Sequence, residues 1–216
     1  MKGLWSIIIV VLIACQCVNA GSKDSNDPND PNDPNGTNGT NDPNYPNDPN
    51  ELLRVKWDAV INILQNKEIN QDAREKKINK IVNSIFDFPL MAKLALGREH
   101  WPKMTPLQRA KFTHLFVEML RTSYREKVSL YTDENVQFKP AVKNKSTVYI
   151  PMELKSKDKK VAILHKLRKA GNRWKVYDVE IQGISILLTY KSQFDDILSR
   201  GTVEDLLSRL EKRPTE

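Results

Sequence analysis

Apolar residues recur along the chain with two periods, which separate predicted helices from predicted strands. Spacing of three and four residues, typical of one apolar helix face, predicts helices over residues 51–64, 70–85, 87–97 and 105–131, from residue 184 and after residue 202. Alternation, typical of a strand with one buried face, predicts strands over residues 135–142, 148–154, 161–167 and 174–181. This order predicts an α+β domain, with N-terminal helices and two C-terminal helices packed on a curved four-stranded antiparallel sheet.

The segment from Arg173 to Phe194 joins the last predicted strand to the helix that follows it. Alternation ends at Gly183, and apolar residues then recur at helical spacing at Ile184, Leu187, Leu188 and Phe194. We therefore expect a strand, a glycine turn and an amphipathic helix that begins at Ile184 with its apolar stripe toward the core.

Two other predicted helices have start signals in their sequence. Asp87 is placed to cap a helix with Pro89 in its first turn, and this helix is predicted to stop at Gly97. Thr105 and Gln108 have the spacing of a capping box, which predicts the start of the longest helix.

Residues 1–20 have the features of an export signal, with Lys2 followed by an apolar run from residue 4 to 14 that is too short to span a bilayer. Two cleavage sites compete. Ala20 ends a small-residue motif of an ordinary secretory signal, whereas residues 12–15 resemble a bacterial lipobox, whose cysteine, here Cys15, is acylated. In both cases the domain is exported to the periplasm, which argues against nucleic acid as a partner.

Residues 21–50 form a predicted linker between this signal and a domain over residues 51–216. Asparagine stands at every third position from Asn26 to Asn50, mostly in Asn-Asp-Pro triplets, and nothing in the repeat can form a core. A calcium-binding array is disfavoured because no bidentate glutamate accompanies the aspartates. A disordered tether of roughly 30 residues could reach on the order of 90 Å, which favours an anchored N-terminus at Cys15.

Charge and cysteine content limit the partners of the domain. The 216-residue chain has a formal net charge of +7, but residues 21–50 hold six Asp and one Lys and Lys2 adds one positive charge, so residues 51–216 carry +11. Such a surface favours anionic partners, although a solvated lysine-rich face fits equally well. Both cysteines, Cys15 and Cys17, precede the domain, which therefore has no disulfide or thiolate metal site.

The sequence offers little that could support catalysis, and we predict no enzyme, metal or cofactor. His100, His114 and His165 have no ligand spacing. Asp178 is an acidic residue within a strand otherwise suited to burial. A structural hydrogen bond or ion pair is favoured for it over a general base, because a mechanism would find few partners.

A family resemblance decides among the remaining functions. The chain from about residue 52 to 210 is similar to the MlaC, or toluene-tolerance, family of exported phospholipid-binding proteins. Matching residues are spread over the predicted domain. They include Phe86-Asp87, Leu96-Gly97, Trp101, Thr105, Gln108-Arg109, Phe112, Phe116, Trp174, Tyr177-Asp178-Val179, Gly183-Ile184-Ser185, Tyr190 to Phe194, Gly201 and Leu206-Leu207. Two features depart from the family: Lys191 stands where arginine is common, and the repeat linker is unusual.

The resemblance implies a carrier without catalytic groups. It would move phospholipid between an outer-membrane lipoprotein and porin complex and the membrane-anchored substrate-binding subunit of an inner-membrane ABC transporter. Hopanoid cargo, an enzyme on a small apolar substrate with Asp178 as base, and an adaptor without a pocket remain alternatives.

The excess of apolar residues on thin layers predicts an apolar pocket, although a filled core is the simpler reading. Ile184 is expected to point into the pocket. The residues expected to contact lipid are Phe116, Leu120, Tyr124, Ile150, Met152, Val161, Ile163, Ile184, Leu187 and Leu188.

Overall fold

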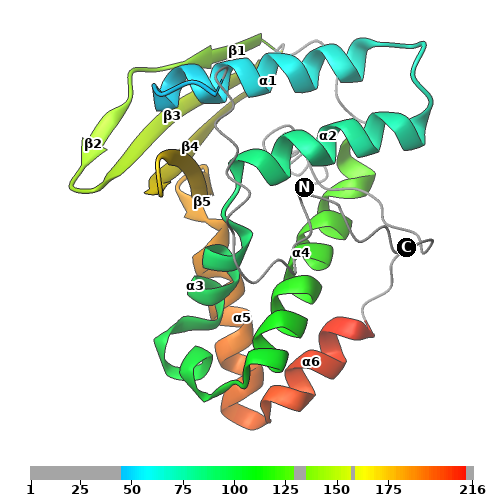
Figure 1. Cartoon of the computed structure of the whole chain (residues 1–216), viewed down its shortest axis with the longest axis vertical. Helices are drawn as coiled ribbons and strands as arrows, with labels where there is room; N and C mark the ends of the chain where they lie inside the picture. The colour runs from blue at the N-terminus through cyan, green and yellow to red at the C-terminus, as the bar shows by residue number, and fades with distance from the viewer. Residues whose placement is uncertain (1–44, 129–134, 157–158, 213–216) are drawn as a thin grey trace.

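The computed structural model describes residues 45–128, 135–156 and 159–212. Figure 1 shows an elongated molecule, with the strands and the first two helices at one end and the other helices at the opposite end. The helices are α1 (Pro49–Gln65), α2 (Gln71–Ile85), α3 (Phe88–His100), α4 (Pro106–Val128), α5 (Ile186–Arg200) and α6 (Val203–Glu211), with a 3-10 turn η1 (Trp101–Lys103). The strands are β1 (Asn135–Phe138), β2 (Val142–Asn144), β3 (Thr147–Ser156), β4 (Lys159–Ala170), β5 (Arg173–Ile181) and β6 (Ile184–Ser185). The predicted α+β class is confirmed.

The strands form one antiparallel sheet in the order β1-β3-β4-β5-β6, and β2 pairs with the same edge of β3 as β1 does. β1, β3, β4 and β5 correspond to the four predicted strands. The prediction missed β2 and β6, which are three and two residues long and too short to show alternation. A bulge between Lys166 and Leu167 shifts the register of β4 against β5, which increases the local twist.

One face of the sheet is buried, and the strand alternation follows directly from this. In the middle of this face Met152 pairs with Ile163, and Ile163 pairs with Ile181. Helices α1, α2 and α3 pack against the strands. Trp57 of α1 meets Phe138 of β1 edge to face, with ring centroids 6.4 Å apart. The face includes Val148, Ile150, Met152, Leu154, Val161, Ile163, Leu167, Val176, Val179 and Ile181.

The predicted helix starts are confirmed. The Asp87 side chain accepts a hydrogen bond from Leu90 N at 3.1 Å. Thr105 and Gln108 form both bonds of a capping box, at 2.7 and 3.2 Å. The first helix begins slightly before Glu51, because the Asp48 side chain accepts from the backbone N–H groups of Asn50 and Glu51 at 2.9 and 2.8 Å.

The end of the repeat linker is attached to the domain. Tyr45 replaces aspartate in the triplet Asn44-Tyr45-Pro46, and its hydroxyl donates to the Trp174 carbonyl at 2.6 Å. The Arg173 guanidinium lies 4.9 Å from the centre of the Tyr45 ring, an arrangement that favours a cation–π interaction. Burial raises the pKa of Tyr45 to about 12, although the Arg173 charge opposes this.

The sequence analysis places the end of the third helix at Gly97, but α3 continues to His100 with a break at Gly97, where φ is 80°. A Cβ at Gly97 would also lie 3.0 Å from Cε of Lys191. The glycine therefore lets α3 bend while Lys191 of α5 lies against its backbone.

The helical end of the molecule has an aromatic core between α4 and α5. Phe112 and Phe116 of α4 stack at 6.0 Å, and Phe194 meets Phe112 edge to face at 5.4 Å. Tyr190 stacks on Phe194 at 6.0 Å. In the part of the chain that the structure describes, no helix is both long and apolar enough to cross a membrane.

The junction after β5 differs from its prediction. Gln182 and Gly183 both have positive φ, at 51° and 79°, and the chain then forms the short β6 before α5 begins. Ser185 caps α5, with its hydroxyl accepting from Leu188 N at 3.1 Å. Because the helix begins at Ile186 and not at Ile184, its buried stripe is Ile186, Leu187, Tyr190 and Phe194.

Candidate functional site

The apolar interior between the sheet and the helices contains most of the residues expected to contact lipid. Ile150, Met152, Val161 and Ile163 are buried on the inner face of β3 and β4. They are contiguous, because Met152 pairs with Ile163 and the neighbouring Leu154 pairs with Val161. The alternation in the sequence therefore assigned these four side chains to the correct face of the sheet.

Three predicted residues on helices belong to the same hydrophobic core. Phe116 and Leu120 are one turn apart on α4, and Leu187 is in the first turn of α5; all three are buried. Phe116 is also part of the aromatic core, 5.7 Å from Tyr190 and 6.1 Å from Phe194. The side chain of Tyr124 lies outside the described residues, and so does Cys15.

Ile184 and Leu188 are placed differently from the expectation. Their side chains are 67% and 66% exposed, so Ile184 does not point into an enclosed interior. Ile184 lies opposite Ile181 in β6, the last strand in the sheet order, and Leu188 lies outside the buried stripe of α5. A role for them in lipid contact remains a prediction.

His165, which has no ligand spacing in the sequence, is a buried polar residue on the inner face. It pairs with Ile150 on one side and with Val179 on the other. Burial lowers the pKa of His165 to about 4, against the opposing effect of a hydrogen bond with the Ile150 backbone. Its Nδ1 has no hydrogen-bond partner among the described residues. The signal was present in the sequence, because position 165 alternates in phase with Ile163 and Leu167.

Asp178 has a structural environment on the opposite face of the sheet. Its carboxylate accepts hydrogen bonds from Lys166 Nζ at 3.1 Å, Ser185 Oγ at 2.9 Å and Leu187 N at 3.3 Å. Lys166 also forms an ion pair with Glu180. Partial burial lowers the pKa of Lys166, but the hydrogen bonds that its ammonium donates to these two carboxylates, together with their negative charges, raise it more, so the pKa lies above its usual value. These three donors, one of them a charged ammonium, hold the carboxylate of Asp178 in place, which supports the structural reading.

The other ionisable groups do not form a catalytic or metal-binding cluster among the residues that the structure describes. His100 Nε2 lies 3.9 Å from Asp195 Oδ1, while His114 is exposed and His165 is enclosed by apolar residues. No group of three or more His, Cys, Asp or Glu side chains in the described ranges is arranged to hold a metal ion. What the described interior offers a ligand is apolar packing.

Comparisons with known proteins agree with one another. The sequence model of the MlaC protein family matches residues 55–212. The chain is 24% identical over 134 residues to the toluene tolerance protein Ttg2D of Pseudomonas putida, and the alignment covers 61% of this chain and 62% of that protein. The chain thus spans less than two thirds of the length of this curated relative. It is also similar to the structure of a phospholipid-binding protein from Ralstonia solanacearum in complex with a phospholipid. The TM-score is 0.67 at 26% identity, with 74% of this chain and 93% of that chain covered.

Proposed function

The chain belongs to the MlaC family, and we propose on this basis that it is a periplasmic phospholipid carrier that holds acyl chains between its sheet and its helices. The observation that carries the proposal is the likeness to a protein whose structure contains a bound phospholipid, which extends over 93% of that chain. The apolar inner face of β3 and β4 supports it, because acyl chains need such a surface.

Apolar burial alone supplies enough free energy for a carrier. Each buried methylene contributes about 0.8 kcal/mol, so two acyl chains bind tightly even where packing is imperfect. The phosphate-bearing head group would stay outside, where lysine and arginine are abundant. Because transfer requires no bond to be broken, the proposal needs no catalytic residue.

The route and partners are part of the proposal and rest on family membership. We infer that the protein receives or delivers lipid at an outer-membrane lipoprotein and porin complex. The other end of the route is the membrane-anchored substrate-binding subunit of an inner-membrane ABC transporter. The export signal in residues 1–20 supports the periplasmic location, and acylation at Cys15 would hold the domain near one membrane.

Lipid analysis of the purified protein tests the proposal. The full chain, expressed in bacteria and purified without detergent, is extracted with organic solvent, and the extract is analysed by mass spectrometry. We expect phospholipid in a fixed ratio to protein across the chromatographic peak. A triterpenoid lipid in the same ratio would change the cargo to a hopanoid. Absence of lipid, or lipid that does not follow the protein, would contradict a carrier.

An enzyme that uses Asp178 as a base is the main rival from another class. The structure gives it little support, because Lys166, Ser185 and the Leu187 backbone already occupy the carboxylate. Asp178 also lies on the face of β5 opposite the apolar interior, paired with Lys166 and not with a core residue.

A further inference from the structure

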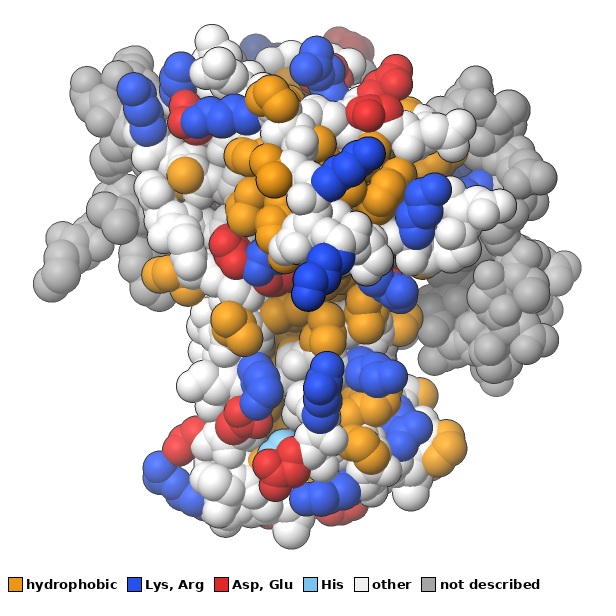
Figure 2. All heavy atoms as spheres, turned by 90° about the vertical axis from the view of Figure 1, so that its left-hand side faces the viewer, with side chains coloured by type: hydrophobic (Ala, Val, Ile, Leu, Met, Phe, Trp, Pro, Cys, Tyr) orange, Lys and Arg blue, Asp and Glu red, His pale blue; other side chains and the backbone are white. Residues whose placement is uncertain are grey.

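Three large apolar side chains are exposed near the narrow middle of the molecule. Ile184 and Leu188 lie at the start of α5, and Leu94 of α3 is 40% exposed. Figure 2 shows apolar side chains gathered in this narrow region, between the wider sheet end and the helical end. We call Leu94, Ile184 and Leu188 the waist patch.

The packing of α3 against α5 brings the waist patch together. Gly97 of α3 lies against the Lys191 side chain of α5, and His100 lies near Asp195. A step of three residues along α3 thus corresponds to a step of four along α5, so the two helices run parallel. Leu94 and Leu188 each lie three residues before the Gly97–Lys191 contact, so they lie at about the same level along the two helices.

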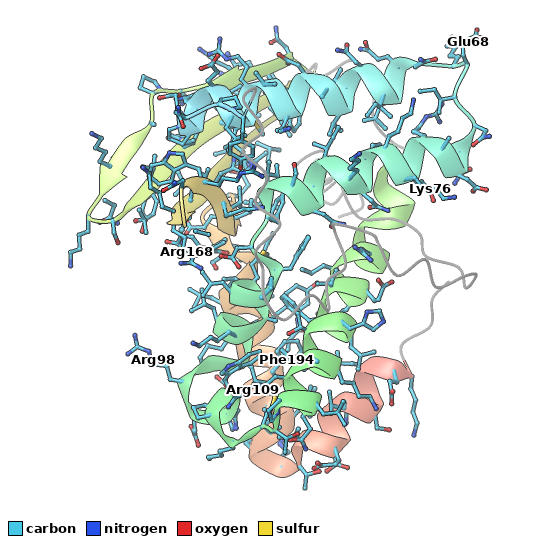
Figure 3. All side chains as sticks on the ribbon, in the orientation of Figure 1. Glu68, Lys76, Arg98, Arg109, Arg168 and Phe194 are labelled. Carbon is cyan, nitrogen blue, oxygen red and sulfur yellow. The ribbon has the colours of Figure 1, made fainter. Side chains whose placement is uncertain are left out.

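Basic residues surround the waist patch. Lys93 and Arg98 are exposed on α3, one residue before Leu94 and one turn after it, and neither forms an ion pair with another residue that the structure describes. Arg168, whose NH2 nitrogen lies 2.7 Å from Asp87 Oδ2, marks the upper edge, since Asp87 caps the start of α3. Figure 3 shows Arg168 and Arg98 on the same side of the molecule, above and below one another.

We propose that the waist patch docks on an anionic lipid bilayer, with Leu94, Ile184 and Leu188 entering the headgroup region and Lys93 and Arg98 contacting lipid phosphates. A large apolar side chain is unfavourable where water surrounds it, and its transfer to the boundary between the head groups and acyl chains of a bilayer is favourable. Basic residues beside an anionic membrane surface are attracted to it, and salt weakens this attraction. The formal charge of +11 on residues 51–216 draws the same molecule toward that surface.

Charge complementarity favours a bilayer over a protein partner as the occupant. An acidic protein would satisfy Lys93 and Arg98, but it would need apolar side chains placed to match three residues from two elements. A fluid bilayer adapts to them without such a match. The inference rests on the proposed function for its biological purpose, because a lipid carrier must exchange cargo with a membrane-associated site, but its test does not depend on bound cargo.

Vesicle binding with matched variants tests the docking surface. All proteins are full chains with Cys15→Ser, so that no acyl anchor contributes. The patch variant is Ile184→Ser with Leu188→Ser. The control is Val142→Ser with Leu107→Ser, which removes one β-branched and one leucine side chain that are 55% and 80% exposed elsewhere. Binding is measured by co-sedimentation with vesicles of phosphatidylcholine, with and without 30% phosphatidylglycerol.

We expect the parent to bind the vesicles with phosphatidylglycerol and to be released by salt. The patch variant should bind on the order of tenfold more weakly, and Lys93→Gln with Arg98→Gln should have a similar effect. The control should change binding less than twofold. Equal binding by the patch and control variants, or no preference for anionic vesicles, would overturn the proposal. The proposal would also be overturned if the patch variant kept its binding to vesicles and lost only its crosslink to a protein of the cell envelope.

The phospholipid content of the same preparations separates this inference from the proposed function. A parent that binds vesicles through the patch but carries no lipid would contradict the carrier and leave the docking surface intact. A parent that carries lipid but binds vesicles independently of the patch would support the carrier and contradict the docking surface.

Discussion

Replacing Asp178 with asparagine should destabilise the protein while leaving its ligand unchanged. The carboxylate is buried and accepts three hydrogen bonds, one of them from the charged Lys166. Asparagine keeps one acceptor oxygen, which can still meet Leu187 N. Its NH₂ group faces the Lys166 ammonium, a donor opposite a donor.

The size of the effect follows from these contacts. A hydrogen bond to a charged group contributes about 1.5–3 kcal/mol, and leaving a buried donor unpaired adds to the loss. Because Lys166 keeps its ion pair with Glu180, we expect Asp178→Asn to lower the free energy of unfolding by about 3 kcal/mol. Glu180→Gln is the matched control, since it removes the more exposed of the two carboxylates on Lys166 and should cost about 1 kcal/mol or less.

Urea unfolding followed by tryptophan fluorescence and circular dichroism measures the change, and mass spectrometry gives the lipid content of the folded variant. A loss of stability below about 0.5 kcal/mol would refute the reasoning, because the removal of one partner from a buried ion pair should cost more than that. A fully folded Asp178→Asn protein without lipid would instead assign the residue to ligand binding.

Three further predictions concern other positions. His165 is neutral in the folded state, with a pKa of about 4 against 6.5 when unfolded. The free energy of unfolding should therefore fall by about 3 kcal/mol as the pH drops from 6.5 to 4. Urea titrations at several pH values should show that slope, and His165→Leu should abolish it. Tyr45→Asp, which restores the regular triplet, removes both the hydrogen bond to Trp174 and the ring beside Arg173 and should cost about 1–2 kcal/mol. Limited proteolysis of this variant should cut closer to α1 than in the parent, and Tyr45→Phe, which keeps the ring but not the hydrogen bond, should lie between the two. Leu187→Ala should lower the free energy of unfolding by about 3 kcal/mol and Leu188→Ala by less than 0.5 kcal/mol, whereas equal losses would mean that α5 begins in the phase expected from the sequence.

Much of the sheet could be predicted from the sequence because one buried face imposes alternation. Ile150, Met152, Val161 and Ile163 were placed on the inner face for this reason, and the register of β3 against β4 confirms that they are neighbours. The helix starts could also be predicted, because the capping side chains of Asp87 and of the Thr105–Gln108 pair bond backbone groups within one turn of the helix.

The junction after β5 could not be predicted in the same way. Gly183 announces a turn, but nothing in the sequence indicates that Gln182 also takes a positive φ, a conformation that is uncommon for residues with a Cβ. The two residues after Gly183 then pair with β5, and the helix begins late. The buried stripe of α5 keeps Leu187 and Phe194 from the predicted one, but it contains Ile186 and Tyr190 in place of Ile184 and Leu188.

Helix α3 shows a second limit of local patterns. The sequence predicts a helix end at Gly97, because glycine commonly ends helices. Its role depends on Lys191, more than 90 residues later in the chain, whose side chain lies where a Cβ at Gly97 would be. Contacts of this kind have no local signature.

Two aspartates connect the helical end to the sheet, and each makes a hydrogen bond between its helix and β5, Asp87 through its backbone and Asp178 through its carboxylate. Asp87 caps α3, pairs with Arg168, and its backbone N–H donates to the Val176 carbonyl of β5 at 2.8 Å. Asp178 belongs to β5 itself and accepts from the first turn of α5. The positions of α3 and α5 relative to the inner face are therefore set by polar contacts, while the apolar residues around a ligand can be exchanged for others of similar volume. In the carrier proposed above, Asp87 and Asp178 would orient helices, so changes at either residue should alter the lipid content only by moving a helix.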